Sequence, residues 1–471
     1  MQQVEQYIAN LKPYDNQLEL LWQQAHKNFN KKIIVLDDDP TGVQTVHGVP
    51  VYTDWTQSTI ESIFEESRQL IFILTNSRSF STEQTIDVHK EIAKTIAEVS
   101  KGKNQPFVLI SRSDSTLRGH YPLETEVLKQ KLENHLNHSY DGEILIPFFK
   151  EGGRETIQDV HYVKQNGQYV PAAQTEFAKD RMFGFTKSDL KEYIEEKTKG
   201  EYSTQTVTSI SLEELRSLEI DKIKQKLRAV KGFNKVVVNA YDEDDLKVFC
   251  IVLFDVINEG KQFLFRTAAS FTKVIGNISS KSLLEKEQLI NANSSNGGII
   301  VVGSHVQKTT EQLNKLMELQ DVKFIEFNCS YVTNDEAFNQ EIARIQTDIN
   351  KTIANGQSVC VYTSRELLKL GNDDREAELA MSVKIANGLT SFVGNCKPEP
   401  RFVIAKGGIT SSDVGTKGLA VKKAEVLGQV APGVPVWQTD AGSTFPNIPY
   451  IIFPGNVGEF NTLQKIVQNL I

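Results

Sequence analysis

Three consecutive carboxylates, Asp37, Asp38 and Asp39, follow the apolar run 33–36 within the stretch LDDDPTG. Adjacent negative charges repel one another, so a metal ion, a cationic group or solvent must compensate for them. Mg²⁺ binds one or two carboxylates together with water and substrate phosphate. Alternatively, Asp39 caps a helix that Pro40 begins. The cluster predicts a metal or substrate role for at least one of the three aspartates.

A second polar stretch, SRSDSTLRGH, follows the apolar run 107–110. Arg118 could hold a carboxylate or phosphate through two parallel hydrogen bonds, and Asp114 could accept a proton from a substrate hydroxyl. A capping acid beside an exposed arginine is the alternative. Gly153 and Arg154, in PFFKEGGR, follow the next apolar run and fit either an anion site or a tight turn. For an acidic substrate, Arg118 is the first candidate cation and Arg154 the second.

In the second half of the chain, stretches rich in glycine and hydroxyl residues follow several of the apolar runs. Glycines let a backbone approach phosphate closely, while hydroxyls and helix N–H groups solvate it. Three stretches have this composition: Gly303-Ser304, Gly407-Gly408-Ile409-Thr410-Ser411 and Gly455-Asn456-Val457-Gly458. Together they predict an anion site. Neither the pattern GxxxxGK[ST] nor a GxGxxG after a strand is present, so these are not P-loop or dinucleotide motifs.

The composition narrows the class of protein. The 471 residues require at least two domains. The net charge is 52 − 60 = −8, with no basic block, which argues against nucleic acid as a partner. The start MQQVEQYIAN lacks the basic and apolar regions of a signal peptide, and no apolar run is long enough for a bilayer. With four scattered cysteines, expected to be buried and reduced, we expect a cytoplasmic protein without membrane contact.

Short, continuous apolar runs recur along the chain, separated by helical stretches, which is typical of strands buried on both faces of mostly parallel sheets. The runs are 32–36, 70–74, 107–110, 143–146, 236–238 and 263–265, then 299–302, 324–327, 359–362, 402–404 and 450–453. We therefore expect an α/β fold of two domains, each a mostly parallel sheet flanked by helices, with a ligand cleft between them.

The predicted organisation has four parts: a helical extension (1–30), a first α/β domain (31–285), a polar linker (286–298) and a second α/β domain (299–471). The linker assignment rests on the turn-forming sequence NANSSNGG. Residues 151–230 are expected to be a helix-rich elaboration of the first domain.

One alternative concerns the acidic cluster. Asp37, Asp39 and Thr41 after an apolar strand resemble the first motif of haloacid-dehalogenase-type phosphatases, in which the first aspartate is the nucleophile. Thr75, after the second apolar run, resembles their second motif. That family gives no account of the glycine-hydroxyl stretches after residue 298.

Taken in order, the motifs resemble the four-carbon acid sugar kinase family over about residues 30–465. The motifs are DDDPTG, SRSDSTLRG, EGGRETI with HYV, TEFAKD, GSHVQKTTEQ, IAKGGITSSDV, APGVPVW and PGNVGE. The chain departs from the family pattern near Leu74 and Asn76, at Asn239, at His305 and Val306, and in the last glycine loop. These departures bear on the substrate and on fine nucleotide contacts.

The resemblance implies an ATP-dependent kinase that phosphorylates a hydroxyl of a four-carbon sugar acid, of the threonate, erythronate or 3-oxo-tetronate type. ATP, Mg²⁺ and the sugar acid are the implied ligands. The expected catalytic residues are Asp38, Asp39 and Asp114. The expected substrate residues are Asp37, Thr41, Arg78, Ser115, Arg118, Gly153 and Arg154. The expected nucleotide residues are Ser304, Gly407, Gly408, Ile409, Thr410, Ser411, Gly455, Asn456 and Gly458. A non-catalytic binding protein is a further alternative, and the oligomeric state stays open, with a homodimer as one candidate.

Overall fold

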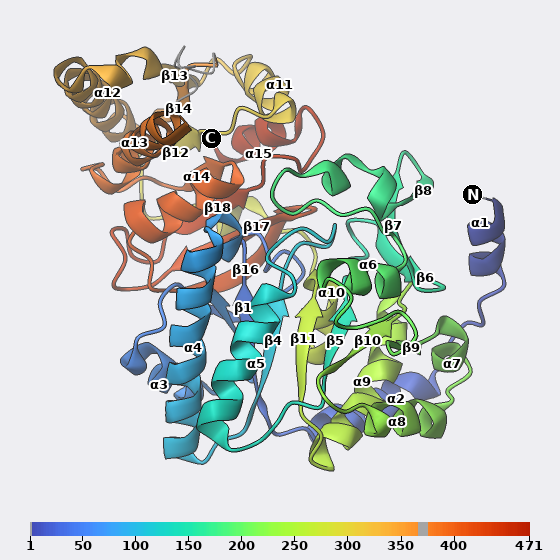
Figure 1. Cartoon of the computed structure of the whole chain (residues 1–471). Coiled ribbons are helices and arrows are strands. Elements are labelled where there is room, and N and C mark those ends of the chain that lie inside the picture. The colour runs from blue at the N-terminus through green and yellow to red at the C-terminus, as the bar shows by residue number, and fades with distance from the viewer. Residues whose placement is uncertain (1, 366–374) are drawn as a thin grey trace. The chain divides into compact units, whose positions relative to one another are not determined.

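The computed structural model describes residues 2–365 and 375–471. The chain divides into two compact units, Met1–Ser280 and Lys281–Ile471 (Figure 1). Both are α/β units, as the sequence predicts, and each is built around a predominantly parallel sheet.

The main sheet of the first unit has the strand order β2-β3-β1-β4-β11-β5-β10-β9, and every neighbouring pair in it is parallel. Its strands are β1 (Lys32–Asp37), β2 (Pro50–Tyr52), β3 (Leu70–Leu74), β4 (Phe107–Arg112), β5 (Gly142–Ile146), β9 (Thr208–Ile210), β10 (Asn234–Val238) and β11 (Phe263–Thr267). The six predicted runs of this half all form strands. They are buried on both faces, which is why their sequences are continuously apolar.

Helices cover this sheet, and in Figure 1 α4 runs beside α5 in front of β1 and β4. The helices of the unit are α1 (Gln2–Ala9), α2 (Gln17–Lys27), α3 (Gln57–Glu65), α4 (Thr82–Lys103), α5 (Leu123–Leu136), α6 (Leu190–Lys197), α7 (Leu212–Arg216), α8 (Ile220–Ala229), α9 (Glu243–Asn258) and α10 (Ala269–Ile275). Isoleucines of the sheet and of α3 and α4 form one core, for example Ile34, Ile60 and Ile92.

Two segments of the first unit differ in part from what the sequence indicates. Residues 151–230 contain the expected helices, but they also form a three-stranded antiparallel sheet of β6 (Arg154–Ile157), β7 (Val160–Gln165) and β8 (Gln168–Pro171). The strands are short and only partly buried, so they lack the continuous apolar run that marks the main sheet. No helix begins at Pro40 either, because residues 40–45 form turns.

The sheet of the second unit has the order β13-β14-β12-β15-β18-β17-β16, parallel up to β18 and antiparallel beyond it. The strands are β12 (Ile299–Val302), β13 (Val322–Phe327), β14 (Ser358–Thr363), β15 (Val403–Lys406), β16 (Lys423–Ala431), β17 (Val434–Thr439) and β18 (Pro449–Phe453). The five predicted runs are present, whereas the β16–β17 hairpin was not predicted. Residues of β16 largely alternate between buried and half-buried positions, so this strand lacks a continuous apolar run, although β17 is mostly buried.

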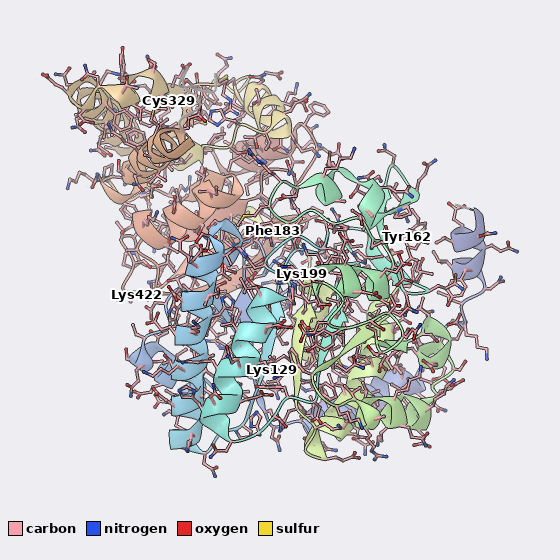
Figure 2. The ribbon with its side chains drawn as sticks, viewed as in Figure 1. Lys129, Tyr162, Phe183, Lys199, Cys329 and Lys422 are labelled. Atoms are coloured by element: carbon pink, nitrogen blue, oxygen red, sulfur yellow. The ribbon has the colours of Figure 1, made fainter. Side chains whose placement is uncertain are left out.

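Five α-helices are described in the second unit: α11 (Gln307–Leu316), α12 (Asp335–Ala354), α13 (Arg375–Gly394), α14 (Gly408–Asp413) and α15 (Thr462–Leu470). Among the described residues, no helix is both long and apolar enough to cross a membrane. The four cysteines are free and buried, Cys329 among them (Figure 2), in agreement with the prediction.

Candidate active site

The three aspartates after β1 lie in three different electrostatic environments. Asp37, at the end of the strand, is 2% exposed, and Arg112 Nη1 lies 3.2 Å from its Oδ1 atom. Burial raises the pKa of Asp37 to about 7, although the Arg112 charge opposes the shift. Gly42 packs directly on this carboxylate, and a Cβ atom at position 42 would overlap with it.

Asp38 is a buried anion held by a guanidinium. Arg78 donates two hydrogen bonds to it, from Nε at 3.1 Å and from Nη2 at 2.5 Å, and the Ser113 hydroxyl donates a third. Burial disfavours the charged carboxylate, but Arg78, Arg266 and Arg112 together outweigh that effect and hold the pKa of Asp38 below its usual value. Asp38 and Arg78 therefore form a fixed ion pair.

Asp39 is the accessible member of the cluster, with a side chain 19% exposed. Its Oδ1 atom accepts hydrogen bonds from the backbone N–H of Thr41, at 2.8 Å, and from the Thr41 hydroxyl. Arg78 Nη1 lies 3.5 Å from Oδ2. Within the described residues, no group of three or more His, Cys, Asp or Glu is arranged to hold a metal ion.

The segment 113–119 after β4 places Asp114 and Arg118 side by side. Arg118 Nε donates to Asp114 Oδ2 at 2.7 Å, and Nη1 lies 3.9 Å from Asp180 Oδ2. The arginine also lies over the Phe177 ring, 5.0 Å from its centroid. Burial works against the Asp114 anion, but Arg78 and Arg118 together hold the pKa of Asp114 below its usual value. Arg118 is thus already compensated by two carboxylates.

Arg154, at the start of β6, makes no close ion pair with any residue that the structure describes. Its Nη1 donates to the Gly152 carbonyl, its guanidinium is 5.9 Å from the Phe177 centroid, and its Nε atom is buried without a hydrogen-bond partner. No carboxylate of the described chain lies within ion-pair distance of Arg154. Burial lowers the pKa of this guanidinium; the charge of Asp114 opposes the shift and that of Arg118 adds to it. A half-buried cation with an unused buried donor is suited to an anionic ligand.

The neighbouring Gly153 has a structural reason to be glycine, because its φ is 66° and an added Cβ would lie 2.7 Å from Lys164 Cβ. Ser115 is buried, and its carbonyl accepts a hydrogen bond from His161 Nε2 at 2.8 Å. Sequence reasoning assigned no role to Arg112, Arg266 or His161. Their positions at strand ends or in quoted motifs were the available indication, but the contacts depend on the tertiary fold.

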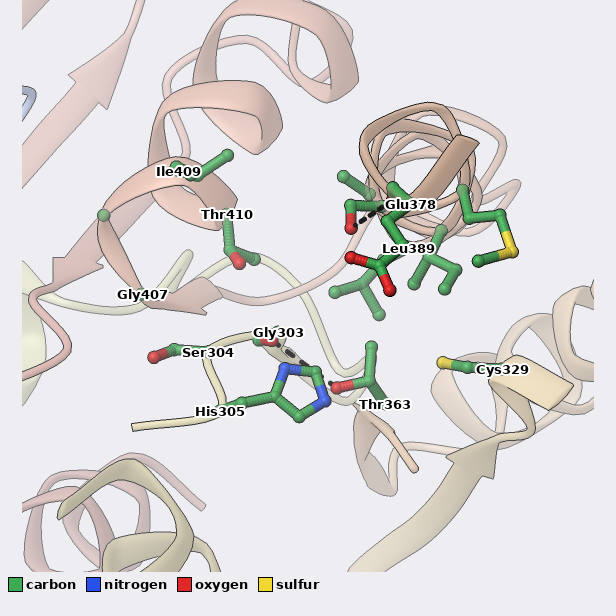
Figure 3. A pocket seen from close by; sticks show the side chains of 15 residues that line it. Gly303, Ser304, His305, Cys329, Thr363, Glu378, Leu389, Gly407, Ile409 and Thr410 are labelled. Atoms are coloured by element: carbon green, nitrogen blue, oxygen red, sulfur yellow. Dashed lines mark hydrogen bonds between the residues drawn. The ribbon is translucent and has the colours of Figure 1, made fainter. Parts of the chain in front are cut away.

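In the second unit, a cavity of about 720 Å³ lies among the predicted glycine loops (Figure 3). One wall consists of the loop after β12 and the start of α14, and Figure 3 shows Glu378 and Leu389 of α13 on the facing side. Five of the predicted nucleotide residues line the cavity: Ser304, Gly407, Gly408, Ile409 and Thr410. Gly303, which precedes Ser304 in the predicted glycine-hydroxyl stretch, lines it as well.

Close packing between these loops depends on glycine. Gly407 has φ 124°, and an added Cβ would lie 2.9 Å from Ser304 Cβ. An added Cβ at Gly303 would collide with the Thr410 hydroxyl. Larger side chains would push the loops apart.

The remaining predicted nucleotide residues do not line this cavity. Ser411 is buried, and its hydroxyl donates to the Ala405 carbonyl at 2.8 Å. Gly458, with φ 82°, supports the turn into α15, and Asn456 is exposed. Gly455 lies beside Ser304, so the third loop borders the first one without reaching the cavity.

Lys406, which ends β15 directly before the Gly407 loop, forms hydrogen bonds to the loop after β18. Its ammonium group donates to the carbonyls of Pro454, at 2.5 Å, and Gly455, at 3.1 Å. The lysine is fully buried, and burial lowers its pKa to about 7, with Lys308 contributing in the same direction. Sequence reasoning overlooked Lys406, although it directly precedes Gly407.

The comparisons with known proteins agree with this two-unit design. A sugar-binding N-terminal domain family matches residues 33–275, and a nucleotide-binding C-terminal domain family matches residues 299–463. Together these domains define a two-domain class that binds a sugar and a nucleotide. The chain belongs to the four-carbon acid sugar kinase family.

Solved structures share the fold. A Haemophilus influenzae protein, HI1011, of the family DUF1537, is 16% identical, with a TM-score of 0.60, over 93% of this chain and 100% of that one. A Salmonella typhimurium LT2 protein, named provisionally as a tRNA synthase, is 16% identical, with a TM-score of 0.64, over 93% and 98%. No curated protein matches the sequence.

Proposed function

We propose that this protein is an ATP-dependent kinase that phosphorylates a hydroxyl of a four-carbon sugar acid, of the threonate, erythronate or 3-oxo-tetronate type. The observation that carries the proposal is the presence of both domain families in one chain, covering residues 33–275 and 299–463. A sugar-binding and a nucleotide-binding domain on one chain provide the two substrates of a phosphoryl transfer.

Arg154, rather than Arg118, is proposed to bind the carboxylate of the acid. A four-carbon acid has few atoms, so its carboxylate must contribute much of the binding, and a desolvated guanidinium can hold it through two hydrogen bonds. Arg118 is engaged with Asp114 and Asp180, whereas the buried Nε donor of Arg154 has no partner in the described part of the chain. Arg118 then serves to orient Asp114.

Asp39 and Asp114 are the carboxylates proposed to act on the reacting groups. Phosphoryl transfer depends mainly on positioning and charge neutralisation. Asp39 is accessible and could hold the Mg²⁺ that accompanies ATP, which when bound would neutralise phosphate charge. Asp114 stays anionic and could orient the substrate hydroxyl. Arg78, held by Asp38, stabilises the anionic form of both carboxylates, because it lies close to Asp39 and its charge lowers the pKa of Asp114.

The nucleotide is proposed to occupy the cavity of the second unit. A volume of about 720 Å³ falls in the range of small-molecule sites. The glycine-rich wall at Gly303 and Gly407 suits phosphates, because backbone N–H groups can approach them there. The apolar residues Met381, Ile385 and Leu389 of α13 suit a base.

The phosphatase alternative is disfavoured by the position of Asp37. A nucleophilic carboxylate must reach the phosphorus atom of its substrate. Asp37 is 2% exposed, packed under Gly42 and bonded to Arg112.

The deciding experiment is a coupled ADP-release assay with Mg-ATP and a panel of four-carbon sugar acids. ADP release that depends on one acid supports the kinase. Phosphate release from phosphorylated acids without ATP would select the phosphatase, and binding of the acid without turnover would select the non-catalytic protein.

A further inference from the structure

The segment 113–119, which carries Asp114 and Arg118, is irregular backbone held by side-chain donors from three separate elements. The carbonyl of Ser115 accepts from His161 of β7, at 2.8 Å. The carbonyls of Leu117 and Arg118 accept from Tyr193 of α6, at 3.0 Å, and from Arg266 of β11, at 3.1 Å. These bonds hold a strained segment, because Leu117 has φ 71°.

The hydrogen bonds of His161 determine its tautomer. A backbone carbonyl can only accept, so Nε2 of His161 must donate to Ser115. The Thr156 hydroxyl lies 3.0 Å from Nδ1, which in the neutral ring accepts from it. Burial lowers the pKa of His161 to about 4, so the ring stays neutral at physiological pH. Both ring nitrogens therefore form hydrogen bonds, with Nε2 as the donor and Nδ1 as the acceptor.

His161 thereby links two parts of the proposed acid site. Thr156 and His161 face each other in the β6–β7 ladder, and Arg154 lies two residues before Thr156 on β6. On the other side, Ser115 directly follows Asp114. The chain Thr156–His161–Ser115 thus connects the strand of the free guanidinium to the segment of the carboxylate.

We propose that His161 is a positioning residue that fixes the segment 113–119 relative to β6, and thereby sets the distance between Asp114 and Arg154. A histidine that merely filled the core would leave this segment unchanged when replaced by a residue of similar size. The measurements of turnover rest on the proposed kinase function, whereas the structural measurement does not.

The test compares His161→Phe with His161→Gln in the full chain. Phenylalanine keeps the volume and loses the donor, whereas the glutamine amide can again donate to the Ser115 carbonyl. We expect faster amide hydrogen exchange in peptides covering 113–119 in His161→Phe, and exchange near that of the wild type in His161→Gln. His26→Phe, a half-buried histidine on α2, is the matched control and should leave these peptides unchanged.

The kinetic measurement uses the acid that the wild type phosphorylates. His161→Phe should raise KM for the acid about tenfold or more, KM for ATP should not change, and His161→Gln should recover most of the loss. Unchanged exchange in His161→Phe, equal effects on both substrates, or a glutamine variant no better than phenylalanine would overturn the proposal.

A second variant covers the case in which His161→Phe does not fold. Thr156→Val keeps the histidine but removes the donor to Nδ1, so it should raise exchange in 113–119 to a smaller extent. No increase would overturn the proposal. If the wild type phosphorylates no four-carbon acid, the kinase function fails while the exchange result still decides the role of His161.

Discussion

At the scale of the residue, identical side chains one position apart acquire different roles from their neighbours. Asp37, Asp38 and Asp39 are equivalent in the sequence. In the structure, burial raises the pKa of Asp37, several guanidinium groups together lower that of Asp38, and Asp39 is accessible to solvent. The mutual repulsion of these carboxylates is compensated by ion pairs of Asp37 with Arg112 and of Asp38 with Arg78.

The raised pKa of Asp37 predicts a specific pH dependence of stability. Its carboxyl group takes up a proton near pH 7 when folded but near its usual value of 3.8 when unfolded. Between these values the native state binds more protons, so this group's contribution to stability falls as pH rises, by about 1.4 kcal/mol per pH unit, and levels off above pH 7. Urea unfolding of wild type and Asp37→Asn from pH 5 to 8 measures it. A stability difference that does not vary with pH would contradict the assignment.

A second prediction distinguishes the proposed roles of Arg118 and Arg154, the two arginines near Phe177. Arg154→Lys should raise KM for the sugar acid about tenfold, because lysine cannot form two parallel bonds to a carboxylate. Arg118→Lys should lower kcat more than it raises KM, since its proposed role is to orient Asp114. Steady-state kinetics distinguish the two, with the exposed Arg228→Lys as control. A larger KM effect at Arg118 would return the carboxylate to that residue.

The site residues show how far sequence reasoning reaches. Candidates that follow an apolar run, such as Asp38 and Gly407, could be selected from the sequence because the carboxyl ends of parallel strands lie at one edge of a sheet. Arg112, His161 and Arg266 were not assigned, because their hydrogen bonds join segments far apart in the sequence. That arginines would neutralise Asp37 and Asp38 could not be derived from spacing.

At the scale of the element, the burial of a strand largely decides whether its sequence reveals it. Most strands buried on both faces carry continuous apolar runs and were recognised, whereas β6 to β8 and β16 are partly exposed and contain polar residues. The mostly buried strand β17 was missed as well. Tertiary context decides such strands more than local propensity does.

Two neighbouring strands of the first unit carry a fully buried ion pair, which gives an element-level prediction. Lys235 of β10 faces Glu143 of β5 in the ladder, with Nζ 2.6 Å from Oε2, and both side chains are 0% exposed. Removing one partner by Lys235→Met should cost about 3–5 kcal/mol, because it leaves a buried charge unpaired. The double variant Lys235→Met/Glu143→Leu should recover most of that loss, as measured by urea unfolding. A double variant less stable than the single one would show that the pair itself stabilises the sheet.

At the scale of the whole molecule, each unit has its own hydrophobic core, one around the strands and helices of the first unit and one around β12, β15 and β18 of the second. The described residues therefore form two bodies that are each able to unfold cooperatively. The division also matches the two domain families, one for sugar and one for nucleotide.

This organisation predicts separate responses to the two ligands. Calorimetry should resolve two unfolding transitions, of which ATP raises one and the sugar acid the other. A ligand at 100 times its Kd adds about 2.7 kcal/mol to the unit that binds it. Gly407→Ala should abolish the shift caused by ATP, because its positive φ and the contact with Ser304 leave no room for a Cβ, and it should preserve the shift caused by the acid. Arg154→Lys should show the reverse pattern. Gly442→Ala, at an exposed and unstrained glycine of the second unit, should keep both shifts. If ATP still stabilised the Gly407→Ala protein to the same extent, the nucleotide would have to bind away from the glycine loops, and the cavity beside α13 would lose its assigned role.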